Sequence, residues 1–323
     1  MKQKKNKKSI KLKVRMSVLA MLLAAFIITL PEKVDTTSAL KPKMIQATVN
    51  NMLLEHVIIH VDDLTQSIKD YESLGFTVTY GGQHGGGFSH NALIHFKDGS
   101  FIELVAFQHT PVLKTLLHLG VLDLYLKDTI KHVRYRFAET VTYPEGFIDS
   151  ALLSNEINIH TSNANRLGLI TTQAMPMTRK KPSGELIKWK IMSPLLDGLP
   201  FVRSPYIPAQ IINRQQTQHK NGVTGVASIH YGVRDLVRAK NQYEQLLGGI
   251  SFDMDSDKTR ASYQLDQVRI TLVKVSETST PYALAKNIRD VPVEISLFTD
   301  MPSKVGALNI NTSHGAKINI VAH

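Results

Sequence analysis

A segment near the start of the chain recurs 172 positions later. The stretch from Leu54 to Leu64 (LEHVIIHVDDL) leads on to a Leu-Gly pair at 74–75, and the stretch from Val226 to Leu236 (VASIHYGVRDL) leads on to the same pair at 247–248. In each copy an apolar run precedes an acidic residue, a helical pattern and a glycine, which predicts a strand, an N-cap, an amphipathic helix and a C-cap. One such unit cannot bury its own sheet face, so we expect units to pair and function to lie in the shared cleft.

The composition is that of a globular protein without a basic binding surface. The chain has 323 residues, of which 43% are hydrophobic and 20% are charged. Its net charge of +11 is misleading, because eight of the 38 basic residues lie in the first 15 positions. The remainder, with 30 basic and 27 acidic residues, is too weakly charged to predict nucleic acid as a partner.

The N-terminal charge belongs to a predicted targeting segment. A basic run ends at Arg15 and is followed by an uncharged apolar run over 16–30, then by Pro31 and small residues up to Ala39. This pattern is typical of a secretory signal peptide, although an uncleaved N-terminal membrane anchor is a close alternative for residues 1–39. The apolar run is shorter than the roughly 20 residues of a membrane span, which slightly favours cleavage. We therefore expect the segment to engage the membrane or the export machinery, and the protein to be extracytoplasmic, either secreted or membrane-anchored.

The absence of cysteine is compatible with an exported bacterial protein. With no cysteine in the chain, a disulfide, a thiolate metal site and a cysteine nucleophile are all excluded.

Hydrophobic periodicity divides the rest of the chain into modules. After a connector at 40–52, the first module has the order β-α-β-β-β, and 110–140 is predicted to be a helical bridge. A weaker second unit follows, then a proline-spaced linker, a third module at 222–275 with a helix at 236–247, and two tail strands too short for a full fourth module. The predicted elements are strand 53–61, helix 64–74 and strands 76–80, 91–97 and 100–107 in the first module, strand 146–154, helix 156–167, a loop around 179–184 and strand 185–192 in the second, and strands near 291–298 and 316–321 in the tail.

Several motifs of the first module together resemble the glyoxalase-like domain family of the vicinal oxygen chelate superfamily. They are Leu54-Glu55-His56-Val57, the helix start Asp62-Asp63-Leu64, Leu74-Gly75-Phe76, Ser89-His90-Asn91-Ala92-Leu93 and Asp98-Gly99-Ser100-Phe101-Ile102-Glu103-Leu104. The resemblance implies an α+β fold in which paired β-α-β-β-β modules form cupped mixed sheets, preceded here by the hydrophobic signal or anchor helix. It places a first domain at 53–205, with modules 53–107 and 146–192, a linker at 206–221 and a second, degenerate domain at 222–323.

The resemblance also implies where a metal would bind. Metal-using members of this superfamily take one ligand from the first strand and one from the fourth strand of each module, which assigns His56 and Glu103 in the first module. Alignment of the second module puts Asp149 at the His56 position and Lys188 at the Glu103 position. Nitrogen and oxygen donors suit a divalent metal (Fe, Mn, Ni, Zn or Co), but lysine is a poor ligand at neutral pH.

Two readings of this set stay open. His56, Glu103 and Asp149 could hold a metal with Lys188 turned away, or Lys188 could pair with one of the carboxylates and replace the metal charge, which we favour. The third module carries Ser228 and Thr271 at the corresponding positions, so we expect no metal there.

Three further residues are candidate ligand contacts. His90 and Asn91 follow a glycine-rich loop, and Trp189, the only tryptophan, is as well suited to stacking on a ligand as to a core role. The sequence therefore predicts an exported protein that binds a small molecule in the cup of the first domain. The alternative is a metal-dependent lyase, isomerase or dioxygenase of the glyoxalase type. Whether the protein is an enzyme, and whether two chains form a homodimer, stay open.

Overall fold

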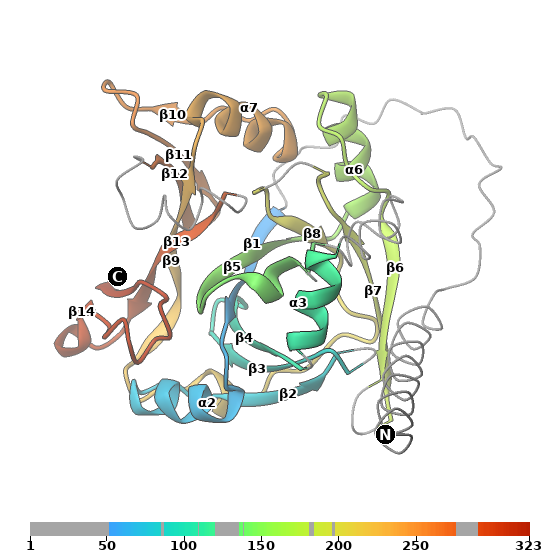
Figure 1. The fold of residues 1–323 in the computed structure, drawn as a ribbon. Helices are drawn as coiled ribbons and strands as arrows, with labels where there is room; N and C mark the ends of the chain where they lie inside the picture. The colour runs from blue at the N-terminus through green and yellow to red at the C-terminus, as the bar shows by residue number, and fades with distance from the viewer. Residues whose placement is uncertain are drawn as a thin grey trace, which may run out of the picture.

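The computed structural model describes residues 52–84, 87–108, 110–119, 136–137, 139–180, 184–195, 198–275 and 290–323. They form two curled mixed β-sheets accompanied by few helices, as expected for an α+β glyoxalase fold (Figure 1). The predicted signal or anchor at 1–39 and almost all of the connector lie outside these residues. Within the described ranges, no helix is long and apolar enough to cross a membrane.

The first sheet is built around two central antiparallel strands. Its eight strands have the order β2-β3-β4-β1-β5-β8-β7-β6, with β1 and β5 paired antiparallel, β1 parallel to β4 and β5 parallel to β8. Each half of the sheet thus places its first and fourth strands side by side near the centre. The strands are β1 (Met52–His60), β2 (Thr79–Gln83), β3 (Ser89–His95), β4 (Phe101–Phe107), β5 (Gly146–Ser154), β6 (Met175–Lys180), β7 (Leu186–Met192) and β8 (Phe201–Arg203).

Helices follow the first strand of each half. The side chain of Asp63 accepts a hydrogen bond from the backbone N–H of Gln66 and caps α2 (Leu64–Ser73), as the sequence predicts. Glu156 occupies the N-cap position of α6 (Ile157–Arg166) in the second half. A third helix, α3 (Thr110–His118), lies in front of the curl of the first sheet (Figure 1). The predicted helical bridge is confirmed over this range, and most of its remainder lies outside the described residues.

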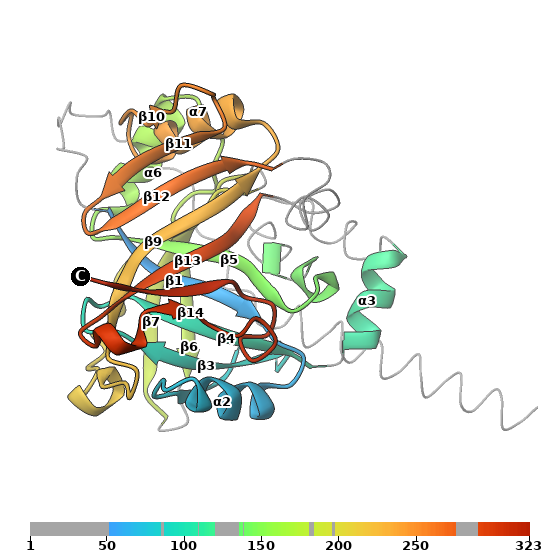
Figure 2. The same ribbon diagram turned by 90° about the vertical axis from the view of Figure 1, so that its left-hand side faces the viewer.

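The second sheet has a comparable strand order but a shorter second half. Its seven strands run β10-β11-β12-β9-β13-β15-β14, with β9 parallel to β12 and antiparallel to β13. Figure 2 shows this sheet stacked beside the first. Its elements are β9 (Val223–Val233), α7 (Leu236–Leu246), β10 (Asp253–Met254), β11 (Arg260–Leu265), β12 (Val268–Lys274), β13 (Val291–Thr299), β14 (Gly306–Ala307) and β15 (Ile318–Ala322), and short 3-10 turns lie at η1 (Thr140–Thr142), η2 (Arg214–Thr217) and η3 (Pro302–Lys304).

One hydrophobic core joins the two sheets. It takes alternate residues from the central strands of both sheets, such as Ile59 and Ile229, together with the apolar faces of α2, α6 and α7. The opposite face of the first sheet carries a smaller apolar cluster from β1, β4, β5, β7 and β8. We call this second surface the inner face, and it is where the predicted cup lies.

Two strands of the first sheet were not predicted. Most of β6 was given no element, and its last two residues fall in the loop predicted around 179–184. Pro176 and two basic residues interrupt its pattern, which a strand tolerates at the edge of a sheet. β8 has only three residues and lies within the proline-spaced tract assigned to a linker. Both errors affect the second half of the sheet, where the site alignment was also weakest.

Candidate functional site

A β-bulge in β1 directs its histidines to the inner face. Leu54 pairs with β5 in one register and His56 in another, so Glu55 is an extra residue between them. Beyond the bulge, His56, Ile58 and His60 alternate onto the inner face, while the residues between them enter the main core. Both histidines are buried.

His56 and Glu103 are brought together, as the family resemblance implies. His56 Nε2 lies 3.5 Å from Glu103 Oε2, and His56 Nδ1 lies 3.2 Å from Glu55 Oε2. The imidazole stacks on Phe101, with 4.5 Å between ring centroids. A carboxylate at each nitrogen and a ring on its face fix the orientation of His56.

Glu103 is held by two more side chains from β3 and from the end of β2. Asn91 Nδ2 donates to Glu103 Oε1 at 2.6 Å, and His84 Nε2 lies 3.3 Å from the same oxygen. Burial alone would raise the pKa of Glu103, but the hydrogen bond and charge of His84, with contributions from His56 and Asn91, lower this pKa to about 2. Glu103 is therefore a buried, ionised carboxylate.

Glu55 is neutralised by an arginine from β8. Both guanidinium nitrogens Nε and Nη2 of Arg203 donate to its carboxylate, and all three groups, Glu55, Arg203 and His56, are buried. Burial opposes ionisation of Glu55, yet the His56 hydrogen bond and Arg203 lower its pKa overall. The Arg203 guanidinium lies 3.7 Å from the ring centroid of Tyr206, so the ion pair is covered by an aromatic ring.

Asp149 lies on the inner face but forms an ion pair with an arginine. Arg136 Nε donates to Asp149 Oδ2 at 2.8 Å and its Nη2 donates to Oδ1 at 2.6 Å, a two-bond pair in a buried setting. Arg136 also donates to the carbonyl of Leu199 and lies over the ring of Phe201. The cation predicted to compensate Asp149 is thus present, but it is Arg136 rather than Lys188.

The strand register corrects the position assigned to Lys188. The positions of the N-caps of α2 and α6 support the equivalence of His56 and Asp149. His56 lies two residues before Ile58, and Asp149 lies two residues before Ala151. Ile58 pairs with Glu103 on β4, and Ala151 pairs with Phe201 on β8. Phe201 therefore occupies the Glu103 position in the second half.

Lys188 belongs to the third strand of that half and points away from the inner face. Its neighbour Trp189 packs in the inner cluster, so the alternation of β7 directs Lys188 to the other face, where it is exposed. The alignment was wrong because it matched β7, which follows a glycine turn as β4 does, in place of the three-residue β8.

The donor set of the inner face does not fit a resident metal. Of the positions that would supply ligands, Asp149 is engaged by Arg136 and the fourth is a phenylalanine. Across the described part of the chain, no three His, Asp or Glu side chains are grouped so that they could hold a metal ion. Of the predicted metal ligands His56, Glu103 and Asp149, only the first two remain free of an arginine, and two ligands are too few for a metal site.

The other predicted ligand contacts are divided between the two faces. Asn91 is part of the site, whereas its neighbour His90 lies on the opposite face, beside the ring of Tyr80. Trp189 is half-buried on the inner face and meets Tyr206 edge to face, with 5.3 Å between ring centroids. Partly buried apolar side chains continue this surface, namely Phe107, Phe137, Met175 and Met177.

Sequence reasoning missed four polar residues of the site. They are Glu55, His84, Arg136 and Arg203, which lie on four different segments. Glu55 was detectable in principle, because a charged residue inside a buried apolar strand requires a cation. Its partner 148 residues away was not, since no local pattern marks it.

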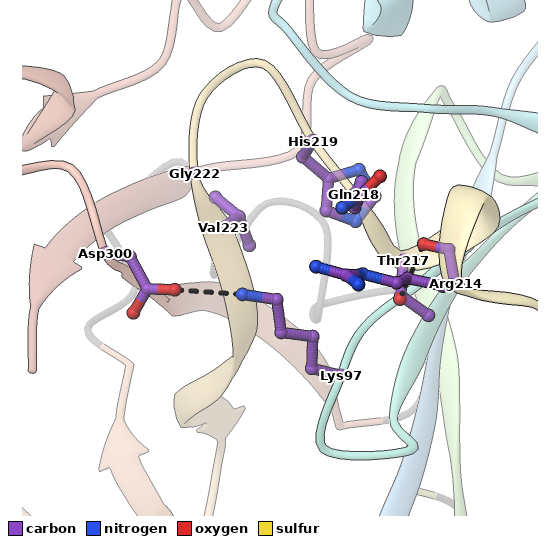
Figure 3. Close-up of a pocket in the computed structure, with 8 residues that line it drawn as sticks. All are labelled: Lys97, Arg214, Thr217, Gln218, His219, Gly222, Val223 and Asp300. Carbon is purple, nitrogen blue, oxygen red and sulfur yellow. Dashed lines mark hydrogen bonds and ion pairs between the residues drawn. The ribbon is translucent and has the colours of Figure 1, made fainter.

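A separate cavity lies where the linker meets both sheets. It measures about 400 Å³ and contains the ion pair between Lys97 Nζ and Asp300 Oδ2 at 2.9 Å (Figure 3). Arg214 and Thr217 of η2 line another side of it. None of the predicted site residues is among its lining groups, so this cavity is distinct from the inner face.

In the second sheet, the residues that correspond to His56 and Glu103 are small and uncharged. Thr271 pairs with His230, which lies two residues after Ser228. In the first sheet, Glu103 likewise pairs with Ile58, which lies two residues after His56. The positions assigned from the sequence in the third module thus agree with the register.

Two solved structures share the fold of this chain. A hypothetical protein from Staphylococcus aureus aligns with a TM-score of 0.61 at 12% identity, over 84% of this chain and 100% of that one. A mutant of 4-hydroxymandelate synthase from Streptomyces coelicolor aligns with a TM-score of 0.50 at 12% identity, over 79% and 76% of the two chains. At these identities the likeness concerns the fold alone.

Sequence comparison identifies the family. No curated protein sequence matches the chain. The sequence model of the glyoxalase-like domain matches residues 54–247, which is more than half of the chain and includes all of the first sheet except the first two residues of β1. The chain therefore belongs to the glyoxalase-like domain family.

Proposed function

We propose that the protein binds a small molecule on the inner face of its first sheet. The observation that carries this proposal is the ionised, buried Glu103, held by His56, His84 and Asn91 beside a partly exposed apolar surface. A few oriented polar groups within an apolar, aromatic lining are typical of small-molecule sites.

A thermal-shift screen of metabolites and antibiotics tests this proposal. We expect at least one compound to raise the melting temperature of the wild-type protein, because a ligand that binds only the folded state stabilises it. The same compound should act weakly on E103Q and fully on K188Q, which alters an exposed residue of the same sheet on the other face. Equal shifts in all three proteins would place the ligand elsewhere.

A metal-dependent lyase, isomerase or dioxygenase is the second candidate. The 3.5 Å contact of His56 with Glu103 favours it, since these are the positions from which metal-using relatives take ligands. The arginine on Asp149 and the phenyl ring of Phe201 weigh against it. Elemental analysis of purified protein after metal reconstitution distinguishes the two, and about one equivalent of transition metal per chain would support the enzyme.

We also propose that the site works outside the cytoplasm. The basis is the basic and apolar N-terminal segment 1–39, which has the pattern of a signal peptide or anchor. A reporter enzyme active only after export, fused behind residue 39, should be active, and should lose activity when 1–39 is deleted.

A further inference from the structure

The cavity between the linker and the two sheets carries more positive than negative charge. Lys97 enters it from the turn between β3 and β4, Arg214 from η2, and Asp300 from the residues just after β13. Lys97 Nζ pairs with Asp300 Oδ2 at 2.9 Å, whereas the guanidinium of Arg214 forms no hydrogen bond or ion pair among the described residues. Figure 3 shows both basic side chains pointing into the same space. Two cations thus share one carboxylate.

The histidine that lines the cavity adds no charge to it. His219 Nε2 lies 3.0 Å from the carbonyl oxygen of His95, and its Nδ1 accepts a hydrogen bond from the backbone N–H of Thr77 at 2.9 Å. Burial lowers the pKa of His219, and the hydrogen bond to His95 opposes this effect only in part. The imidazole is therefore neutral at physiological pH, and both of its nitrogens are already in use.

Neither nearby carboxylate is available to Arg214. The second oxygen of Asp300 lies 3.4 Å from His323 Nε2, so this group is shared by two basic side chains. Asp98 does not line the cavity, and its two oxygens accept from backbone N–H groups at 2.9 and 3.0 Å. In a concave surface the fields of neighbouring charges add, so an excess cation attracts a small anion more strongly there than on an open surface.

We propose that this cavity is a second binding site, independent of the inner face, which takes a small molecule through a phosphate or carboxylate group held between Lys97 and Arg214. The planar guanidinium matches two oxygens of such a group, and the lysine adds a point charge. A volume of about 400 Å³ leaves room for more than the anionic group. Thr217 and Gln218 also line the cavity and offer a hydroxyl and a side-chain amide to the rest of the ligand.

Thermal denaturation of the full chain tests this site, in increasing inorganic phosphate or acetate at an ionic strength held constant with sodium chloride. R214Q removes the unpaired cation, and D300N removes the carboxylate that competes for Lys97. K220Q is the matched control, because Lys220 is an exposed cation close to η2 in the chain that does not line the cavity. Phosphate also stabilises folded proteins by exclusion from their surface, but that effect is common to all four proteins.

We expect the rise in melting temperature to give the same dissociation constant for phosphate in wild type and K220Q. The constant should be about fivefold or more weaker in R214Q, as for loss of one charge-assisted contact, and tighter in D300N, where Lys97 is released to the anion. Acetate that acts in the same order of variants would support a carboxylate as the anchoring group.

Equal rises in all four proteins would show surface exclusion alone and overturn the inference. A dissociation constant that is unchanged in R214Q, or weaker in D300N, would overturn it as well. The inner face takes no part in this test, so none of these results bears on the function proposed above.

Discussion

Gly81 gives Asn91 the room to hold Glu103. A Cβ at position 81 would lie 2.3 Å from Asn91 Oδ1. We therefore expect G81A to displace the Asn91 amide from the carboxylate and to destabilise the fold by about 1–3 kcal/mol, as for other overpacked sites. Chemical denaturation measures this change.

The double variant G81A/N91A provides the control. Removing the amide also removes the clash, so the double variant should cost less than the two single changes added together. Strict additivity would show that Gly81 acts independently of Asn91.

His95 should make the protein sensitive to mild acid. Burial lowers the pKa of His95 to about 4, against the smaller opposing effect of Glu55. The unfolded chain then binds more protons than the folded one between pH about 6.5 and 4. Stability contributed by neutral His95 is complete above pH 6.5 and is lost on acidification, at up to about 1.4 kcal/mol per pH unit.

H95F should flatten this part of the stability profile. Above pH 6.5 the difference in free energy of unfolding between H95F and wild type reports packing alone. The value of each protein above pH 6.5 is therefore the reference for its own change on acidification. Glu103 acts in a lower window, because its pKa falls from 4.5 to about 2 and its contribution is lost only below pH 4.5. An unchanged slope between pH 6.5 and 4 in H95F would contradict the assignment to His95.

At the scale of elements, the short strand β8 decides the chemistry of the site. It brings Phe201 to the place of a ligand and Arg203 to Glu55. Because Lys188 lies on the other face of β7, we expect K188E to leave metal content unchanged. Elemental analysis of the variant and wild type, reconstituted side by side, checks this. A gain of metal in K188E would support the sequence alignment that puts Lys188 at the Glu103 position, and would contradict the strand register.

The first half of the site was predictable from sequence and the second half was not. β1 to β4 have regular alternation and clear turns, so His56 and Glu103 were placed on the correct strands. β6 and β8 are short and contain or adjoin proline, and their assignment depends on pairing with distant strands. The arginine partners of Glu55 and Asp149 lie on segments that are distant in the sequence or poorly patterned. Local periodicity cannot reveal such pairs.

At the scale of the molecule, buried tyrosines connect the two sheets. Tyr231 of β9 and Ser150 of β5 form a hydrogen bond of 2.7 Å between their hydroxyls, on the face of β5 opposite the inner face. Burial raises the pKa of Tyr231, so the phenol stays neutral at physiological pH. His314, in the loop before β15, reaches Asp70 of α2 at 3.1 Å and Glu145, just before β5, at 2.9 Å.

Because one core includes both sheets, the described fold should unfold as a unit. Trp189, the only tryptophan, lies in the first sheet and reports on it by fluorescence. Y231F changes the second sheet, yet it should lower the midpoint seen by Trp189, with a cost of about 1–2 kcal/mol for the lost buried hydrogen bond. Y231F/S150A should cost less than the sum of the single variants, since both remove the same bond. A Trp189 transition unmoved by Y231F would mean that the sheets unfold separately, and that the second sheet contributes nothing to the stability of the inner face.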